Sequence, residues 1–178
     1  DAIAELANVD ENRRKWLYSA FDELLTSLQL LDDLTDWEED FEIGNMTFPL
    51  TIAAERNRYF FGNTSRARFD KKTAILELIN TGAIEETLRM AITHLKRTLE
   101  KFDADATGRT SCCSAYVRAL IKDGQNVLVT IGKARLTIKR AMMIARNQTG
   151  IAHNNNQMEI NHTIQIVKRS LHIVAQSS

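Results

Sequence analysis

Carboxylates are concentrated in one short segment of the chain, which reads Asp-Asp-Leu-Thr-Asp-Trp-Glu-Glu-Asp. Residues four positions apart on a helix drift by only about 40°, so Asp32, Asp36 and Asp40 are predicted to project from one helical face. Asp33 flanks that face. Like charges at this spacing repel one another, and acids near a helix C-terminus oppose the helix dipole, so a cation is expected to compensate them.

Magnesium is the cation that these ligands predict. It prefers hard carboxylate oxygens, keeps several of its waters, and is commonly held by one or two carboxylates together with substrate phosphates. We therefore expect Asp32 and Asp36, with Asp33 or Asp40 as further ligands, to hold Mg²⁺ against a diphosphate. The alternative is a solvated acidic helix face, which is the commoner fate of a run of charge.

An apolar stripe leads to these carboxylates. Phe21, Leu25 and Leu28 precede Asp32 by eleven, seven and four residues, which places them on nearly the same helical face. We predict that they line an apolar substrate cavity, with Leu28 nearest to the reacting carbon and Phe21 about 16 Å from the metal. Each of the three would equally suit an ordinary bundle core.

The spacing of apolar residues predicts helices almost throughout, and the predicted fold class is an all-α helical bundle. Asp10 is the expected N-cap of the first helix, Gly44 and Gly82 are expected helix ends, and Pro49 suits a first turn that Thr47 would cap. The predicted helices span 10–39, 47–61, 70–80, 84–102, 111–123, 127–146 and 158–175; the predicted loops are 62–65, 103–110 and 154–157, and 127–129 would also suit a short strand.

Length and charge indicate one domain whose two parts neutralise each other. The 178 residues carry no net charge, yet residues 1–55 hold fourteen acidic and three basic residues, whereas 56–178 hold nine acidic and twenty basic ones. A nucleic-acid-binding tail is the alternative, but no base-stacking or helix-turn-helix pattern accompanies the charge, so no nucleic-acid partner is predicted. No apolar run reaches the roughly 18 residues of a transmembrane segment and no signal peptide is evident, so a cytoplasmic location is expected.

Several other polar and aromatic residues are candidates for a functional role. The four histidines lack ligand-like spacing and are expected on the surface or in the core. Trp37 is expected to pack rather than react. The cations of the predicted helix 127–146 are expected to be solvated, with neutralisation of a diphosphate or of the acidic half as the alternative; they are Lys133, Arg135, Lys139, Arg140 and Arg146.

The segment from Leu28 to Asp36 resembles the second aspartate-rich motif of the trans-polyprenyl diphosphate synthases, an aromatic residue and Gln followed by Asp-Asp-x-x-Asp, with Leu28 in the aromatic position. The continuation to Asp40, with Gly44 and Phe48-Pro49, is spaced like the second motif of squalene and phytoene synthases. Both families belong to the class I isoprenoid synthases. Asn45 stands where prenyl synthases carry a lysine, and their longer Gly-Lys loop is missing.

The resemblance continues through Gly82-Ala83-Ile84-Glu85 and His94-Leu95, so 1–102 are assigned to isoprenoid-synthase-like helices and 103–178 to C-terminal helices of the same domain. It implies an isoprenoid diphosphate substrate, Mg²⁺, and a role for Gln29 in contacting the substrate or a carbocation; a plain surface Gln is nearly as common. The reaction implied is prenyl transfer or terpene cyclisation.

Enzymes of this superfamily use two acidic motifs on facing helices, and the sequence contains only one. The chain therefore resembles the C-terminal half of a catalytic bundle. Three alternatives stay open: the N-terminal half is missing from this piece, a partner chain supplies it, or the protein is a non-catalytic helical interaction subunit that retains the motif. A homodimer is the other possible partner state.

Overall fold

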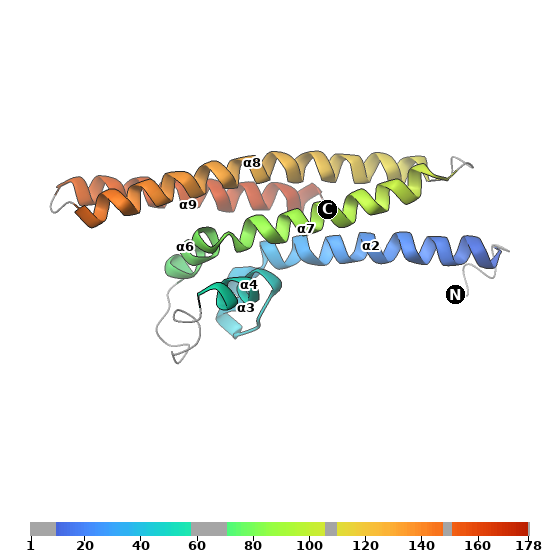
Figure 1. Ribbon diagram of the computed structural model, residues 1–178, viewed down its shortest axis with the longest axis horizontal. Coiled ribbons are helices and arrows are strands. Elements are labelled where there is room, and N and C mark those ends of the chain that lie inside the picture. The colour runs from blue at the N-terminus through green and yellow to red at the C-terminus, as the bar shows by residue number, and fades with distance from the viewer. Residues whose placement is uncertain (1–9, 58–70, 106–109, 148–150, 178) are drawn as a thin grey trace.

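The computed structural model describes residues 10–57, 71–105, 110–147 and 151–177, and the regular structure in these ranges is α-helical (Figure 1). The predicted all-α class is therefore confirmed. Within the same ranges no helix is long and apolar enough to cross a membrane. In chain order the helices are α2 (Glu11–Thr35), α3 (Trp37–Ile43), α4 (Phe48–Arg56), α6 (Lys71–Thr81), α7 (Ala83–Asp103), α8 (Ser111–Asn147) and α9 (Ile151–Ser177).

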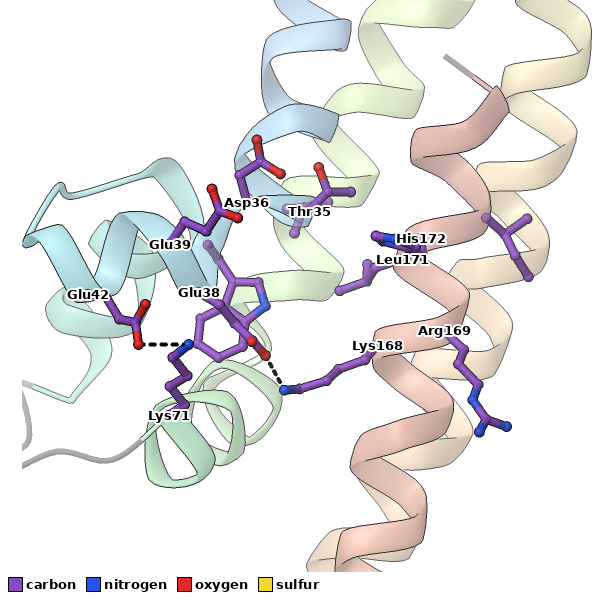
Figure 2. Close-up of a pocket in the computed structure, with 13 residues that line it drawn as sticks. Thr35, Asp36, Glu38, Glu39, Glu42, Lys71, Lys168, Arg169, Leu171 and His172 are labelled. Atoms are coloured by element: carbon purple, nitrogen blue, oxygen red, sulfur yellow. Dashed lines mark ion pairs between the residues drawn. The ribbon is translucent and has the colours of Figure 1, made fainter.

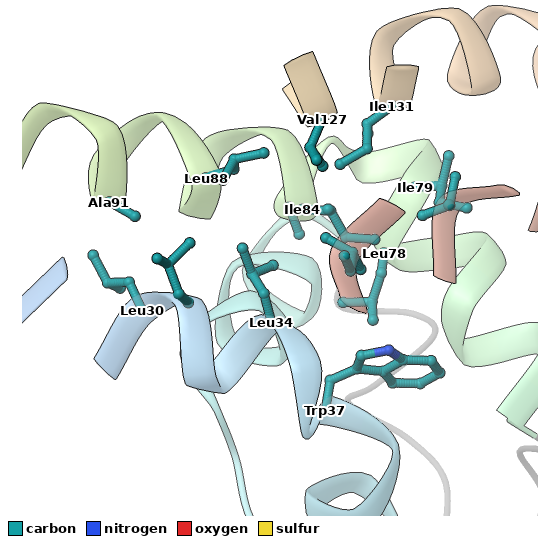
Figure 3. Packing of buried hydrophobic residues seen from close by; sticks show 14 of the residues in the cluster. Leu30, Leu34, Trp37, Leu78, Ile79, Ile84, Leu88, Ala91, Val127 and Ile131 are labelled. Atoms are coloured by element: carbon teal, nitrogen blue, oxygen red, sulfur yellow. The ribbon is translucent and has the colours of Figure 1, made fainter. Parts of the chain in front are cut away.

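Helix α7 is the central element of the packing. α2 lies along one side of it and α8 along the other, and α9 pairs with α8 (Figure 1). Figure 3 shows Leu30 of α2 facing Ala91 of α7, and Val127 of α8 beside Leu88. The buried residues of α7 recur at three- and four-residue spacing, as an amphipathic helix requires; they are Ala83, Ile84, Thr87, Leu88, Ala91, Ile92, Leu95, Thr98 and Phe102.

The predicted helix 10–39 is in fact two helices, so the prediction of one continuous helix is wrong. α2 starts as predicted after Asp10, whose carboxylate accepts a hydrogen bond of 3.0 Å from the Arg13 amide. The chain leaves the helix at Asp36, which has φ −96° and ψ 5°. The break turns the Trp37 side chain into the core, where it is 3% exposed, and burial of so large a ring outweighs the lost helical turn. Trp37 thus packs, as expected.

The predicted starts and stops around α3, α4 and α6 are mostly confirmed. Gly44 ends α3 in the left-handed region, with φ 78°, and Thr47 and Pro49 occupy the expected positions at the start of α4. α4 ends at Arg56. The predicted helix end at Phe61 and the loop 62–65 lie outside the described residues.

Two predicted interruptions late in the chain are wrong. The predicted helices 111–123 and 127–146 form the single helix α8, which also excludes a strand at 127–129. Gly124 does not stop the helix because it lies where α8 passes α7, and a Cβ there would be 3.1 Å from Cγ1 of Ile92. The predicted loop 154–157 is part of α9. Asn disfavours a helix only weakly, so packing of α9 on α8 overrides it.

Gly82 joins α6 to α7, and Arg135 of α8 holds this joint. Nη1 of Arg135 donates to Oε2 of Glu85 at 2.6 Å, and Nη2 donates to the carbonyl of Asn80 at 3.0 Å. Gly82 has φ 76°, and a Cβ on it would lie 2.8 Å from Nη1 of Arg135. The backbone angle therefore requires glycine, and an added Cβ would also displace the end of the Arg135 side chain.

Alanine at Gly82 and at Gly132 should change stability in opposite directions. Gly82→Ala is expected to lower the free energy of unfolding by about 1–2 kcal/mol or more, because it strains a left-handed residue and displaces Arg135. Gly132 lies inside α8, and its added Cβ would meet only Oε1 of Glu85 at 3.6 Å, so Gly132→Ala should raise that free energy by roughly 0.5–1 kcal/mol. Urea unfolding followed by circular dichroism measures both, and a shift of the same sign for both would contradict this account.

A polar cluster joins α2 to α7 beside the core. Nδ1 of His94 and Oε2 of Glu23 are 2.6 Å apart, and Nζ of Lys101 is 3.8 Å from Oε1 of Glu23. Lys101 also donates to the carbonyl of Ser19 at 2.8 Å. The hydrogen bond to His94 lowers the pKa of Glu23, burial opposes this, and the nearby positive charges lower it further. Ionised Glu23 therefore stabilises the folded state.

Stability contributed by Glu23 should disappear in acid. Because its folded-state pKa is depressed, the contribution is complete above the ordinary value of 4.5 and is lost as the pH falls through the folded-state pKa. Glu23→Gln should therefore cost roughly 1 kcal/mol at neutral pH, and wild type and variant should converge below that range. Thermal unfolding over a pH series tests this. The exposed Glu100 of α7 serves as control, since Glu100→Gln should change stability little at any pH.

Candidate functional site

Two exposed carboxylates of the acidic segment, Asp32 and Asp36, lie at the C-terminal end of α2. Asp32 is in the last turn of the helix and Asp36 is its C-cap, with the Asp36 amide donating to the Asp32 carbonyl at 3.0 Å. Both residues are exposed. Within the described ranges neither carboxylate forms an ion pair or accepts a hydrogen bond. These two acids thus remain available to a ligand.

Asp33 has a structural role, because both of its carboxylate oxygens accept hydrogen bonds within the fold. Its Oδ2 accepts a hydrogen bond of 2.9 Å from the amide of Phe48, and its Oδ1 accepts one of 2.9 Å from Nε2 of Gln29. The first bond satisfies a free amide at the start of α4, which the side chain of the N-cap residue Thr47 leaves unbonded. Asp33 therefore fixes α4 against α2, and Gln29 is held beside it.

Asp40 lies on α3, beyond the break at Asp36, so it does not share a helical face with Asp32 as the sequence predicted. Its Oδ1 accepts a hydrogen bond of 2.9 Å from Nδ2 of Asn45. A backbone hydrogen bond still links Asp36 to Asp40, because the Asp40 amide donates to the Asp36 carbonyl at 3.0 Å.

A groove of about 560 Å³ runs along the outer face of α2 and collects most of the predicted site residues. Among the predicted site residues, Asp33 and Asp40 do not line this groove. Phe21 lies one turn before the groove. The walls of the groove are formed only by residues of α2 and its C-cap; they are Leu25, Leu28, Gln29, Leu31, Asp32, Thr35 and Asp36.

The three predicted cavity residues differ in burial. Leu25 is 61% exposed and Phe21 is 42% exposed, whereas Leu28 is half-buried and packs against the core. The ring of Phe21 meets Phe102 of α7 edge to face, with 6.0 Å between centroids. The apolar stripe is therefore anchored to the core at its edges, while its centre at Leu25 faces outward.

A second cleft, of about 690 Å³, opens where α3, the start of α6 and α9 approach one another (Figure 2). Glu42 pairs with Lys71 across 2.7 Å, and Glu38 pairs with Lys168. The Lys168 ammonium also lies over the Trp37 ring, 5.8 Å from its centroid. The hydrogen bond to Glu42 raises the pKa of Lys71. Figure 2 shows both ion pairs.

The cations that pair with Glu38 and Glu42 were not predicted from the sequence. They come from α6 and α9 rather than from the basic stretch of α8. In Figure 2 His172 points toward the second cleft, which Lys168 also lines. The spacing of Lys168 and His172, four residues apart on a helix, was the available signal, since it places both on one face.

Replacing Asp33 and Asp32 singly should separate the structural acid from the exposed one. Asp33→Ala removes the cap of α4 and should cost about 0.5–2 kcal/mol of unfolding free energy. Asp32→Ala removes an exposed carboxylate without a partner, so it should change stability by less than about 0.5 kcal/mol. Chemical denaturation measures both variants, and equal losses would refute the capping role.

A metal site is not preformed by side chains alone: the described residues contain no group of three or more His, Cys, Asp or Glu side chains placed to hold a metal ion.

Comparison of the chain with protein-family models, with curated proteins and with solved structures found no match. The function of the α2 groove is therefore inferred from its own residues and geometry.

Proposed function

We propose that this chain binds Mg²⁺ and an isoprenoid diphosphate at the C-terminal end of α2, as one half of a class I isoprenoid synthase site. The observation that carries the proposal is the groove on α2, in which exposed Leu25 and half-buried Leu28 lead directly to the free carboxylates of Asp32 and Asp36. An amphiphile with an apolar chain and a charged head matches this order of surfaces.

The donor set suits magnesium. Asp32 and Asp36 lie one helical turn apart, and Mg²⁺ is usually held by one or two carboxylates with waters and phosphate oxygens completing its shell. Bound there with a diphosphate, magnesium would supply charge that favours departure of the diphosphate as a leaving group. Gln29 is tethered to Asp33 at 2.9 Å, so its amide would be held in place beside the departing group.

The apolar part of the proposed site is open on the side away from α7. An allylic carbocation survives only where water is excluded. Phe21 and Leu25 would therefore form a cavity wall only when another surface covers them. Prenyl transfer and terpene cyclisation, the two reactions of this class, both need that cover.

A second candidate function, a non-catalytic interaction subunit, is favoured by the same exposure. Tyr18, Phe21 and Leu25 are 49%, 42% and 61% exposed on one helix, and clustered exposed apolar residues mark interaction surfaces. In that case the groove would bind protein, and the acids would have no preference for magnesium diphosphate.

Calorimetry with magnesium and inorganic pyrophosphate tests the proposed site. Each ligand should strengthen binding of the other, because the carboxylates hold the metal and the metal holds the phosphates. An Asp32→Ala, Asp36→Ala double variant should weaken pyrophosphate binding at saturating magnesium by more than about tenfold.

The matched control removes two acids from the same helix away from the groove. Glu11→Ala with Asp22→Ala makes the same change in charge, and both residues are exposed, so binding should stay within about twofold of wild type. If wild type and both double variants bind equally, the assignment is wrong and the interaction subunit becomes the better account.

A further inference from the structure

The outer face of α2 has a charge order that is complementary to itself. Arg14, Tyr18, Leu25, Asp32 and Asp36 lie within about 40° of one line along the helix, since the turn per residue is 100°. The line starts with a base, passes through an aromatic and an aliphatic residue, and ends with two acids. Leu25, at its centre, is among the most exposed large apolar residues of the described chain, at 61%.

Among the described residues, the side chain of Arg14, the base at the start of this line, forms no ion pair. Nε of Arg14 is buried and has no hydrogen-bond acceptor among the described residues. Lys15 beside it is exposed, and among the described residues it pairs only with Glu11, at 3.3 Å on the same helix. At the other end Asp32 and Asp36 are equally without partners in the described ranges. The N-terminal end of this line on α2 is therefore basic and its C-terminal end is acidic, so the two ends attract each other when two copies are antiparallel.

We propose that a second copy of this chain docks antiparallel on this face, with the two-fold axis passing at Leu25. In that register Leu25 meets its own copy, Tyr18 lies opposite Asp32 of the second copy, and Arg14 lies opposite Asp36. A two-fold interface requires each patch to be complementary to itself, and this ordering of residues meets the requirement. Helices packed in this way lie about 8–10 Å apart.

The groove on α2 offers a place for the aromatic residues of the second copy. The same register sets Phe21 of one copy opposite Gln29 of the other, within the hollow of about 560 Å³ between Leu25 and Asp36. Each copy thereby contributes an aromatic residue and a base to the acidic end of the other.

Charge reversal tests the proposal in a way that depends on the antiparallel register. Arg14→Glu with Lys15→Glu, and separately Asp32→Lys with Asp36→Lys, places like charges opposite one another at both ends of the dimer. Each double variant should raise the dimer dissociation constant by more than about tenfold. An equimolar mixture of the two should dimerise again, because opposite charges then meet at both ends. Sedimentation velocity over a concentration series measures all four samples.

Cross-linking tests the position of the two-fold axis. With the free thiols Cys112 and Cys113 changed to Ser, Leu25→Cys should form a disulfide dimer under mild oxidation. Thr26→Cys, exposed but turned about 100° away, should not. Circular dichroism checks that each variant folds, and Leu25→Glu gives a second route to a monomer.

Three results would overturn the proposal: a wild-type chain that stays monomeric throughout the series, double variants that dimerise like wild type, or equal cross-linking at positions 25 and 26. A monomeric wild type would mean that no second copy covers α2. The proposal does not rest on magnesium binding, so pyrophosphate calorimetry and sedimentation can fail independently.

Discussion

Burial of two opposite sides of α7 is the constraint on which the rest of this structure depends. α2 and α8 both pack against it, and small residues permit the close approach: Ala91 faces α2 in Figure 3, and Gly124 of α8 lies against Ile92. Because α2 and α8 lie on opposite sides of α7, each of them buries only one of its own sides against α7. α2 lies at the edge of the molecule (Figure 1), so the other described helices leave its outer face uncovered.

Whether an acidic side chain near the end of α2 has a cationic partner depends on the side of the molecule that it faces. On the side of α3 that faces α6 and α9, Glu42 and Glu38 have lysine partners from those helices. On the outer side of α2, the carboxylates of Asp32 and Asp36 have no partner in the described residues. Repulsion between them lacks compensation within that part of the chain, which is why a metal or a second copy is expected there.

Periodicity in the sequence was sufficient for the helices of the core and for most of their ends. The stripe of α7, the cap at Asp10 and the left-handed glycines Gly44 and Gly82 all follow from local rules, and the structure confirms them. These features depend on residues within one or two turns. The identity and rough bounds of the helices were accessible for that reason.

The features that were missed depend on contacts between distant segments. The break at Asp36 follows from the burial of Trp37, and the continuity of α8 through Gly124 follows from its contact with Ile92. The sequence grouped four acids as ligands, but Asp33 bonds to the Phe48 amide fifteen residues away. A spacing rule cannot distinguish a capping acid from a free one.

Metal binding and self-association, if both proposals hold, are linked through the same carboxylates. Arg14 of the second copy would lie opposite Asp36, where Mg²⁺ alone would compete with it for negative charge. A magnesium diphosphate complex is itself anionic and would attract that base instead. Free magnesium should thus weaken the dimer and the diphosphate complex should strengthen it, and the linkage must be reciprocal. The sign of this coupling follows from charge alone, because both ligands share Asp32 and Asp36.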